Sequence, residues 1–229
     1  MGSGRWCRDF NLDEFRGGLC LAATANVAHP RLNFGSMSQT SPAAQRRLLI
    51  ADLAPSGLAW DVATAALGAL LVGALAQVSY YLPGMPVPFT GQTLGVLLVA
   101  AAVGAQRGAA AMALYAGAGI AGVPWFAGGA AGFPKFTFGY LIGFAVAAAL
   151  VGTLARRGWI RTPWATFAAM LLGTIAIYAC GVPWLAMALG GNWATAIASG
   201  LTPFLASDAL KAALAALMLP AATALLRRR

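Results

Sequence analysis

The chain has 229 residues, of which 60% are apolar and 9% are charged, and its 15 Lys and Arg residues against 6 acidic residues give a net charge of +9. Soluble domains average about 45–50% apolar and about 25% charged residues. So few charges cannot cover an ordinary wet surface, which argues against a soluble globular enzyme and predicts lipid as the solvent for most of the chain. The arginines lie at the ends of apolar runs, so the positive charge indicates membrane topology and not nucleic-acid binding.

Residues 1–55 differ in kind from the rest, because they carry several charges and contain no apolar run long enough to span a membrane. We expect a disordered cytoplasmic tail over 1–55, followed by a transmembrane domain over 56–229. Met37, followed by Ser-Gln-Thr-Ser-Pro, would make a natural start. Residues 1–36 are therefore expected to be either the product of an upstream start or part of that tail.

Six apolar segments follow in chain order, at 62–81, 90–105, 108–122, 137–155, 163 to beyond 184, and 203–226. A helix needs about 20 residues to cross the hydrocarbon core, so the second and third segments are slightly short and are expected to tilt or to thin the bilayer. Pro183 is expected to kink or break the fifth. The fold class predicted is an all-α membrane protein with six transmembrane helices.

The basic residues are distributed unevenly between the two ends of these helices. The alternate loops at 83–88, 123–136 and 190–202 contain one basic residue, Lys135. Nine arginines flank the opposite ends, namely Arg46, Arg47, Arg107, Arg156, Arg157, Arg161, Arg227, Arg228 and Arg229. Cytoplasmic loops carry the excess of Lys and Arg, so this pattern places both termini in the cytoplasm.

Asp208 and Lys211 are the charged residues inside an apolar segment that most need an explanation. They lie three positions apart on the last helix, so they share a face and can pair. A charge at mid-membrane costs about 2.5–3.5 kcal/mol on insertion scales. The pair is either a structural ion pair or a ligand-binding site in the outer half of the bilayer.

Further polar candidates lie at the same outer level. The segment 88–93 opens the second helix and contains Thr90 and Gln92. The Gln92 amide offers both donors and an acceptor, to a ligand or to a neighbouring helix. Tyr115 and Tyr140 are either ligand contacts or interfacial anchors.

The loop at 125–132 combines aromatic residues with glycines, among them Phe126, Gly128 and Gly129. Such a loop suits a mobile lid over a small apolar ligand, although Gly-rich loops are common.

Small residues recur at four-residue spacing on the first helix, at Ala65, Ala69 and Gly73. Stripes of this kind let helices approach closely in lipid. The stripe predicts either packing within the chain or docking to a partner membrane protein.

Several kinds of site have no support in the sequence. The spacings of Cys7, Cys20 and Cys180 fit no zinc or disulfide pattern, and His29 is the single histidine. The sequence contains neither a P-loop nor the H-E-x-x-H and G-x-S-x-G motifs. We therefore expect no metal, no cofactor and no enzymatic activity in this chain.

Four stretches, in order and at matching spacing, make the region 60–226 resemble the BioY family, the biotin-specific S components of energy-coupling-factor (ECF) transporters. They are Val87-Pro88-Phe89-Thr90-Gly91-Gln92-Thr93, Gly122-Val123-Pro124-Trp125-Phe126-Ala127-Gly128-Gly129, Gly139-Tyr140-Leu141-Ile142-Gly143-Phe144, and Pro203-Phe204 with Asp208-Ala209-Leu210-Lys211. The segment 133–138 departs from the family pattern.

The resemblance implies an S-component-like bundle, multi-pass in the bacterial cell (inner) membrane, that captures biotin from the outer side. Family members work with a transmembrane coupling subunit and two ABC-type ATPases, so ATP would bind only in those partners. The family's biotin-binding Asp and Lys match Asp208 and Lys211, and its docking stripe matches the small residues of the first helix.

Three alternatives remain open from the residues alone. An S component or small transporter for another solute would use the same outer pocket. An intramembrane enzyme would need a further ionisable group beside Asp208 and Lys211, and a structural scaffold would leave this buried pair unexplained.

Overall fold

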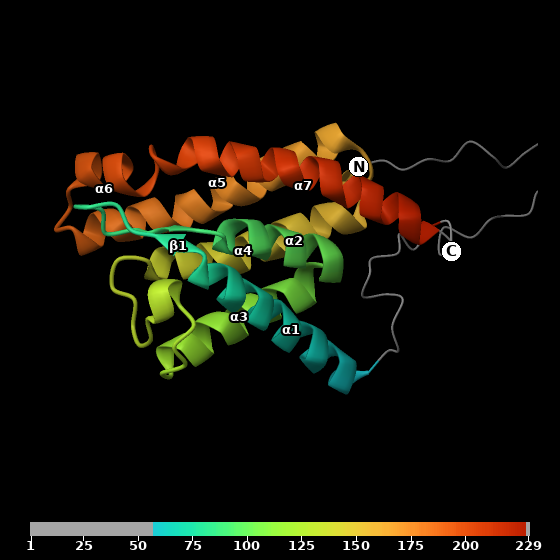
Figure 1. The fold of residues 1–229 in the computed structure, drawn as a ribbon, viewed down its shortest axis with the longest axis horizontal. Coiled ribbons are helices and arrows are strands. Elements are labelled where there is room, and N and C mark those ends of the chain that lie inside the picture. The colour runs from blue at the N-terminus through green and yellow to red at the C-terminus, as the bar shows by residue number, and fades with distance from the viewer. Residues whose placement is uncertain (1–56, 228–229) are drawn as a thin grey trace, which may run out of the picture. The chain divides into compact units, whose positions relative to one another are not determined.

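The computed structural model describes residues 57–227, so the predictions for residues 1–55 lie outside the described part. This part is almost wholly helical (Figure 1). Its elements are α1 (Leu58–Gln77), β1 (Ser79–Tyr80), β2 (Phe89–Thr90), α2 (Gln92–Val103), α3 (Ala105–Ile120), η3 (Ala127–Gly129), α4 (Phe138–Arg156), η4 (Trp159–Arg161), α5 (Pro163–Ala188), α6 (Trp193–Gly200) and α7 (Phe204–Arg227).

Four of these helices are long and apolar enough to cross a membrane, namely α1, α4, α5 and α7 over Phe204–Leu225. The helix α2 is apolar but has only 12 residues, and α3 has 16 residues. The six predicted segments therefore all contain helices, of which two are shorter than a full membrane crossing requires.

Of the kink or break expected at Pro183, the break does not occur: α5 runs continuously from Pro163 to Ala188 with Pro183 inside it, although a proline removes one backbone hydrogen bond. Another local prediction is wrong. The segment 190–202, expected as a loop, contains the short helix α6, whose first turn is capped by the Asn192 side chain accepting from the Thr195 N–H at 3.0 Å.

The first helix also ends earlier than expected, at Gln77. The next residues form a two-stranded antiparallel pairing, with Ser79 opposite Thr90 and Tyr80 opposite Phe89. This pairing fixes the chain immediately before α2. It thereby sets the position of Thr90, whose carbonyl faces α7 in the site described below.

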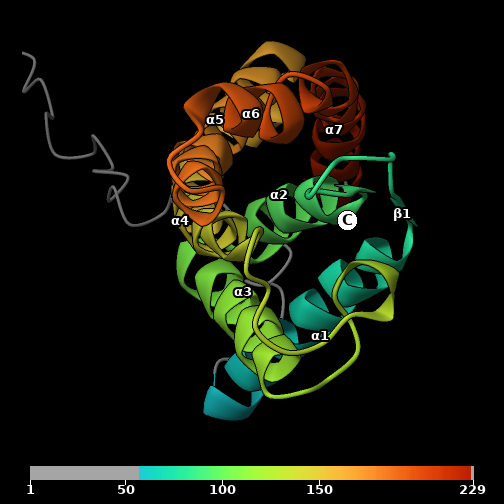
Figure 2. The same cartoon turned by 90° about the vertical axis from the view of Figure 1, so that its left-hand side faces the viewer.

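The helices form three layers when viewed end-on. Figure 2 shows α2 and α4 between the α1 and α3 pair on one side and α5, α6 and α7 on the other. Close approach between α3 and α4 depends on Gly152, because a Cβ there would lie 2.3 Å from the backbone nitrogen of Ala105. The central position of α2 and α4 makes both helices available to line an internal site.

The small-residue stripe of α1 faces the inside of the chain. Ala65 is 8% exposed, Ala69 is fully buried, and Gly73 packs against the Trp125 ring. The face that α1 turns outwards carries large side chains instead, among them Leu67 and Leu70. These contacts favour packing within the chain over partner docking, because a partner helix could reach the stripe only if α1 moved.

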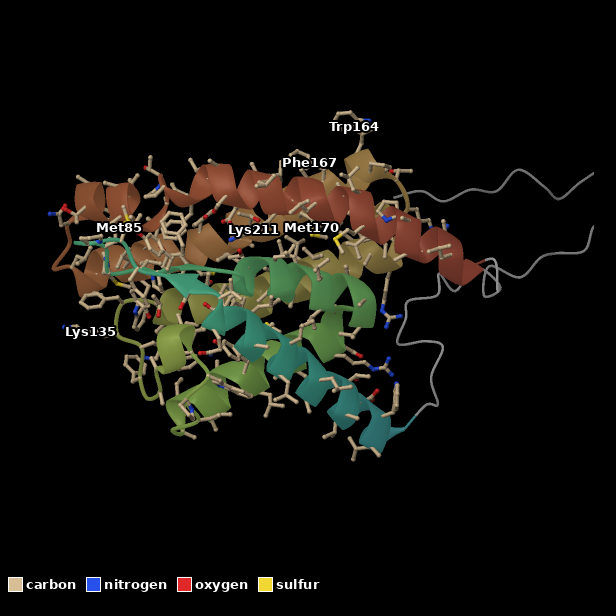
Figure 3. The ribbon with its side chains drawn as sticks, in the orientation of Figure 1. Met85, Lys135, Trp164, Phe167, Met170 and Lys211 are labelled. Atoms are coloured by element: carbon tan, nitrogen blue, oxygen red, sulfur yellow. The ribbon has the colours of Figure 1, made fainter. Side chains whose placement is uncertain are left out.

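The two ends of the helices differ in chemistry. The β1–β2 pairing, α6 and the exposed Lys135 lie at one end (Figures 1 and 3). At the opposite end Arg107 of α3 pairs with Asp61 of α1, with 2.6 Å between a guanidinium nitrogen and Oδ1. The described arginines thus gather at one end of the helices and Lys135 at the other, as the uneven loop charges predict.

Candidate functional site

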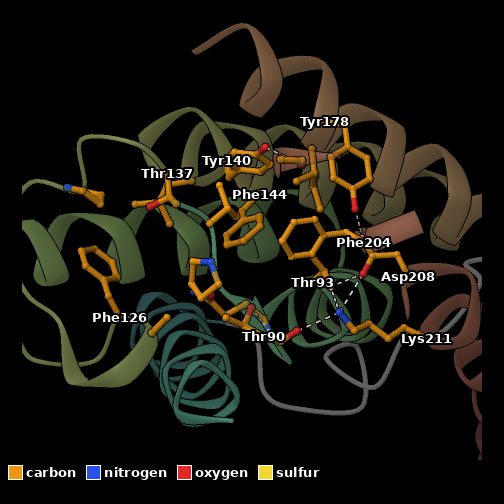
Figure 4. Close-up of a pocket in the computed structure, with 18 residues that line it drawn as sticks. Thr90, Thr93, Phe126, Thr137, Tyr140, Phe144, Tyr178, Phe204, Asp208 and Lys211 are labelled. Carbon is orange, nitrogen blue, oxygen red and sulfur yellow. Dashed lines mark hydrogen bonds and ion pairs between the residues drawn. The ribbon is translucent and has the colours of Figure 1, made fainter. Parts of the chain in front are cut away.

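A cavity opens at the end of the helices that holds the β1–β2 pairing. Residues from α2, α4, α5, α6 and α7 line it, together with the segments before α2 and α4 and the loop between α3 and α4 (Figure 4). Its lining is Val87, Pro88, Thr90, Gln92, Thr93, Phe126, Ala127, Pro134, Thr137, Tyr140, Leu141, Phe144, Ile177, Tyr178, Gly200, Phe204, Asp208 and Lys211. Most of these side chains are apolar or aromatic, as in cavities that enclose small organic ligands.

Asp208 and Lys211 form the centre of a polar cluster in this cavity. Their side chains are 5% and 19% exposed, and 2.8 Å separates Lys211 Nζ from Asp208 Oδ1. Lys211 Nζ also donates to the Thr90 carbonyl and to Thr93 Oγ1, each at 2.9 Å. Thr93 Oγ1 donates in turn to Asp208 Oδ1 at 3.1 Å. A buried ion pair requires such additional bonds, because desolvation otherwise outweighs its attraction.

Tyr178 of α5 completes the cluster by donating its hydroxyl to Asp208 Oδ2. Sequence reasoning missed both Tyr178 and Thr93. Thr93 stands directly after Gln92 in the stretch 87–93 that carries the family resemblance, so that stretch could have indicated it. Tyr178 lies 30 residues before Asp208 in a uniformly apolar helix, and only the packing of α5 against α7 brings the two together.

Gln92 faces the cavity and also reaches behind it. Its Nε2 donates to the Tyr115 hydroxyl at 2.6 Å, which is the interhelical bond that the sequence allowed. Tyr115 is fully buried and is absent from the cavity lining. Its hydroxyl donates to the Trp125 carbonyl at 3.3 Å, and Trp125 Nε1 donates to the Tyr115 carbonyl at 2.9 Å. Tyr115 therefore connects the cavity wall to the loop after α3.

That loop contributes Phe126 and Ala127 to the lining, whereas Gly128 and Gly129 are exposed and are not part of the lining. The two glycines have φ angles of 67° and 75°, a region that side chains disfavour, and so they form the turn itself. The loop is fastened to the end of α1, because Tyr81 donates its hydroxyl to the Ala127 carbonyl at 2.9 Å.

The opposite wall of the cavity is aromatic. Phe204 stacks on Phe89 with 4.3 Å between ring centroids, and Phe144 lies on the α4 side. Tyr140 is buried and donates its hydroxyl to the Gly200 carbonyl at 2.7 Å, which joins α4 to α6. Pro134 and Thr137 show that the atypical 133–138 segment also borders the cavity.

Six of the predicted contact residues thus meet in one cavity: Thr90, Gln92, Phe126, Tyr140, Asp208 and Lys211. The cavity has an apolar body with one charged, hydrogen-bonding end, which suits a small ligand of matching polarity. Within residues 57–227 no group of three or more His, Cys, Asp or Glu side chains could hold a metal ion.

The fold defines the class of protein first. It matches the crystal structure of the S component for biotin from an ECF-type ABC transporter, with a TM-score of 0.65 and 22% sequence identity over 76% of this chain and 96% of that one. The described part therefore has the fold of an S component, a helical membrane protein.

Sequence comparison then gives the family. The BioY family model matches residues 43–228. The biotin transporter BioY of Rhizobium etli is 34% identical over 69% of this chain and 89% of its own length. The biotin transporter BioY of Rhodobacter capsulatus is 37% identical over 66% of this chain and 86% of its own length. The biotin transporter BioY2 of Lactococcus lactis is 34% identical over 65% of this chain and 82% of its own length. This chain belongs to the BioY family.

Proposed function

We propose that this chain is the biotin-binding S component of an ECF transporter and mediates biotin uptake. Membership of the BioY family supports the substrate, because the relatives described above are biotin transporters. The observation that carries the proposal is the cavity, which combines an apolar aromatic body with the Asp208 cluster at one end. Biotin has a polar ureido ring at one end, an apolar ring and chain in the middle and a carboxylate at the far end, so its ureido end and apolar middle match this cavity.

The chain acts as a transport subunit and not as an enzyme. ATP is hydrolysed by partner subunits, since this sequence contains no P-loop. Those partners are a transmembrane coupling subunit and ABC-type ATPases, as the fold relative's ECF-type transporter implies.

In the membrane, the helices α1, α2, α3, α4, α5 and α7 serve as six spans, with both termini in the cytoplasm of a bacterial cell. The arginine-rich loops support this orientation. Because α2 and α3 are short, the bilayer thins or these helices tilt. The cavity then opens toward the outer side, where biotin is captured.

Within the site, Asp208 accepts hydrogen bonds from the ureido ring. Lys211 and Thr90 belong to the polar cluster that holds Asp208 in place. Gln92, Phe126 and Tyr140 contact the ligand from the walls. Tyr115 supports Gln92 from behind. Gly128 and Gly129 shape the loop that carries Phe126.

The test is uptake of radiolabelled biotin by a biotin-auxotrophic bacterium that lacks its own biotin transporter. Expression of this chain together with ECF partner subunits should give uptake that unlabelled biotin abolishes and that excess thiamine or riboflavin leaves intact. Uptake competed by another vitamin and not by biotin would reject biotin as the substrate. The altered 133–138 segment would then be the first place to look for the change in specificity.

A further inference from the structure

A second hollow lies at the arginine-rich end of the helices, opposite the end that holds the ligand cavity (Figure 1). The starts of α1 and α3 and the end of α4 enclose it, and we call it the α1–α3 groove. Its volume is about 630 Å³, within the range of sites that hold small organic molecules. It shares no lining residue with the ligand cavity, so the proposed function leaves it unexplained. The lining is Leu58, Asp61, Val62, Ala65, Ala105, Gln106, Arg107, Ala110 and Arg156.

The charged part of this groove is built from three helices. Arg107 of α3 and Arg156 of α4 supply two guanidinium groups, and Asp61 of α1 supplies one carboxylate. Asp61 Oδ1 accepts from Arg107 Nε at 2.7 Å and lies 2.6 Å from a second guanidinium nitrogen of Arg107. This pair ties α1 to α3 and thereby holds Arg107 in the groove wall. Two guanidinium groups against one carboxylate leave one net positive charge, which favours an anionic occupant.

The rest of the lining forms an apolar strip. Leu58, Val62 and Ala65 follow one face of α1 at spacings of four and three residues, and Ala110 stands three residues after Arg107 on α3. Leu58 and Val62 are 80% and 58% exposed, whereas Ala65 is 8% exposed. From Leu58 to Ala65 the helix rises about 10 Å, away from the arginine-rich end. The strip therefore leads from the guanidinium groups into the hydrocarbon region of the membrane.

We propose that the α1–α3 groove binds an anionic phospholipid, with its phosphate against Arg107 and Arg156 and one acyl chain along the apolar strip. Guanidinium groups bind phosphate oxygens through charge-assisted, often bidentate hydrogen bonds. Basic pockets between transmembrane helices bind acidic lipid headgroups. A soluble anion would leave the apolar strip uncovered, and a zwitterionic lipid would bring a cationic group close to the same arginines. The occupant therefore combines a net negative charge with a hydrocarbon chain.

The first test compares lipids on the unmodified full chain in detergent, with native mass spectrometry to measure bound lipid. Dioleoyl phosphatidylglycerol is anionic, and dioleoyl phosphatidylcholine has the same acyl chains without a net charge. Each arginine near an acidic headgroup contributes about a fivefold gain, so the anionic lipid should bind at least tenfold more tightly. Equal binding of the two lipids would overturn the proposal. Displacement of the anionic lipid by inorganic phosphate alone would also overturn it, because the groove would then recognise a free anion.

The second test uses two neighbouring arginines at the end of α4. Arg156 lines the groove, whereas Arg157 is exposed beside it and is outside the lining. Arg156→Gln and Arg157→Gln remove the same charge one position apart, and both should keep a monodisperse size-exclusion profile and the biotin affinity of the unmodified chain. Arg156→Gln should weaken phosphatidylglycerol binding about fivefold, and Arg157→Gln less than about twofold. Equal losses would show diffuse attraction to surface charge and would refute a site in the groove.

The third test fills the apolar strip without changing any charge. Ala110 lines the groove, and Ala113 is exposed one turn further along α3, outside the lining. Ala110→Trp should weaken phosphatidylglycerol binding at least threefold, and Ala113→Trp should leave it unchanged. If Ala110→Trp does not give a monodisperse chain, Ala110→Leu takes its place with the same expected direction. Unchanged lipid binding after either substitution of Ala110 would contradict the position assigned to the acyl chain.

Discussion

Two ion pairs of this chain use the same kind of charges in different surroundings. Asp61 and Arg107 join α1 to α3 at the arginine-rich end, with side chains 48% and 20% exposed. Asp208 and Lys211 lie in the cavity at the other end, 5% and 19% exposed, and share their bonds with Thr90, Thr93 and Tyr178. Exposed pairs contribute about 0–1 kcal/mol, whereas a buried pair must overcome a desolvation cost of several kcal/mol.

A contribution to folding stability alone does not explain the buried pair of Asp208 and Lys211. Apolar residues of similar volume would fill the same space without the cost of removing two charges from water. The polar cluster around Asp208 is therefore better understood as a preorganised binding surface, and the Asp61 pair as a local link between two helices.

Removing the charge of Asp208 should have the largest effect. Asp208→Asn keeps the size of the side chain but replaces a charged acceptor with an amide beside the Lys211 ammonium. We expect biotin affinity to fall at least tenfold, or about 1.4 kcal/mol, measured by calorimetry on the purified variant. Unchanged affinity in a well-folded sample would remove the distinction between the two pairs.

Overpacking behind the cavity should have the next largest effect. A Cβ at Gly119 would lie 2.2 Å from the Phe126 ring, so Gly119→Ala must push that ring toward the cavity. Overpacking costs about 1–3 kcal/mol, and we expect a lower melting temperature and weaker biotin binding. Gly117→Ala on the same helix meets no atom within 4 Å and is the matched control. Equal behaviour of the two variants would contradict the packing described.

The structure shows why sequence reasoning reached some of these features and not others. The helical segments follow from local apolar runs. Thr90, Gln92, Asp208 and Lys211 could be expected at one level because each lies near the outer start of its predicted helix, and they line one cavity. The pairing of Ser79 with Thr90 and the bond from Tyr178 to Asp208 depend on tertiary packing. Nothing in the sequences of these segments indicates that they contact each other. The spacing of Ala65, Ala69 and Gly73 predicts a close contact, but spacing cannot tell whether the partner helix belongs to the same chain.

Tyr115→Phe should affect stability more than binding, because Tyr115 is buried behind the cavity wall. The variant leaves the Gln92 amide and the Trp125 carbonyl each without one partner. A typical hydrogen bond contributes about 1 kcal/mol, and we expect a loss of that order in thermal unfolding with a less than tenfold change in biotin affinity. A loss of binding without a loss of stability would instead make Tyr115 part of the ligand contact.

Asp61→Asn should have the smallest effect. The Asp61 side chain is 48% exposed, so its pair with Arg107 contributes about 1 kcal/mol, and the pair lies at the opposite end from the cavity. Biotin affinity should stay within twofold of the unmodified chain, and the melting temperature should change little. A large loss of biotin affinity would show that the two ends of the chain are coupled, and would contradict the conclusion that the Asp61 pair is only a local link between two helices.

The most direct test of the central claim is calorimetric titration of biotin into the detergent-purified chain, beside thiamine and riboflavin and with Asp208→Asn run in parallel. The account predicts tight binding of biotin, no binding of the other two vitamins, and at least tenfold weaker biotin binding by the variant. Absence of biotin binding in a folded, monodisperse sample, or equal binding by the variant, would contradict it.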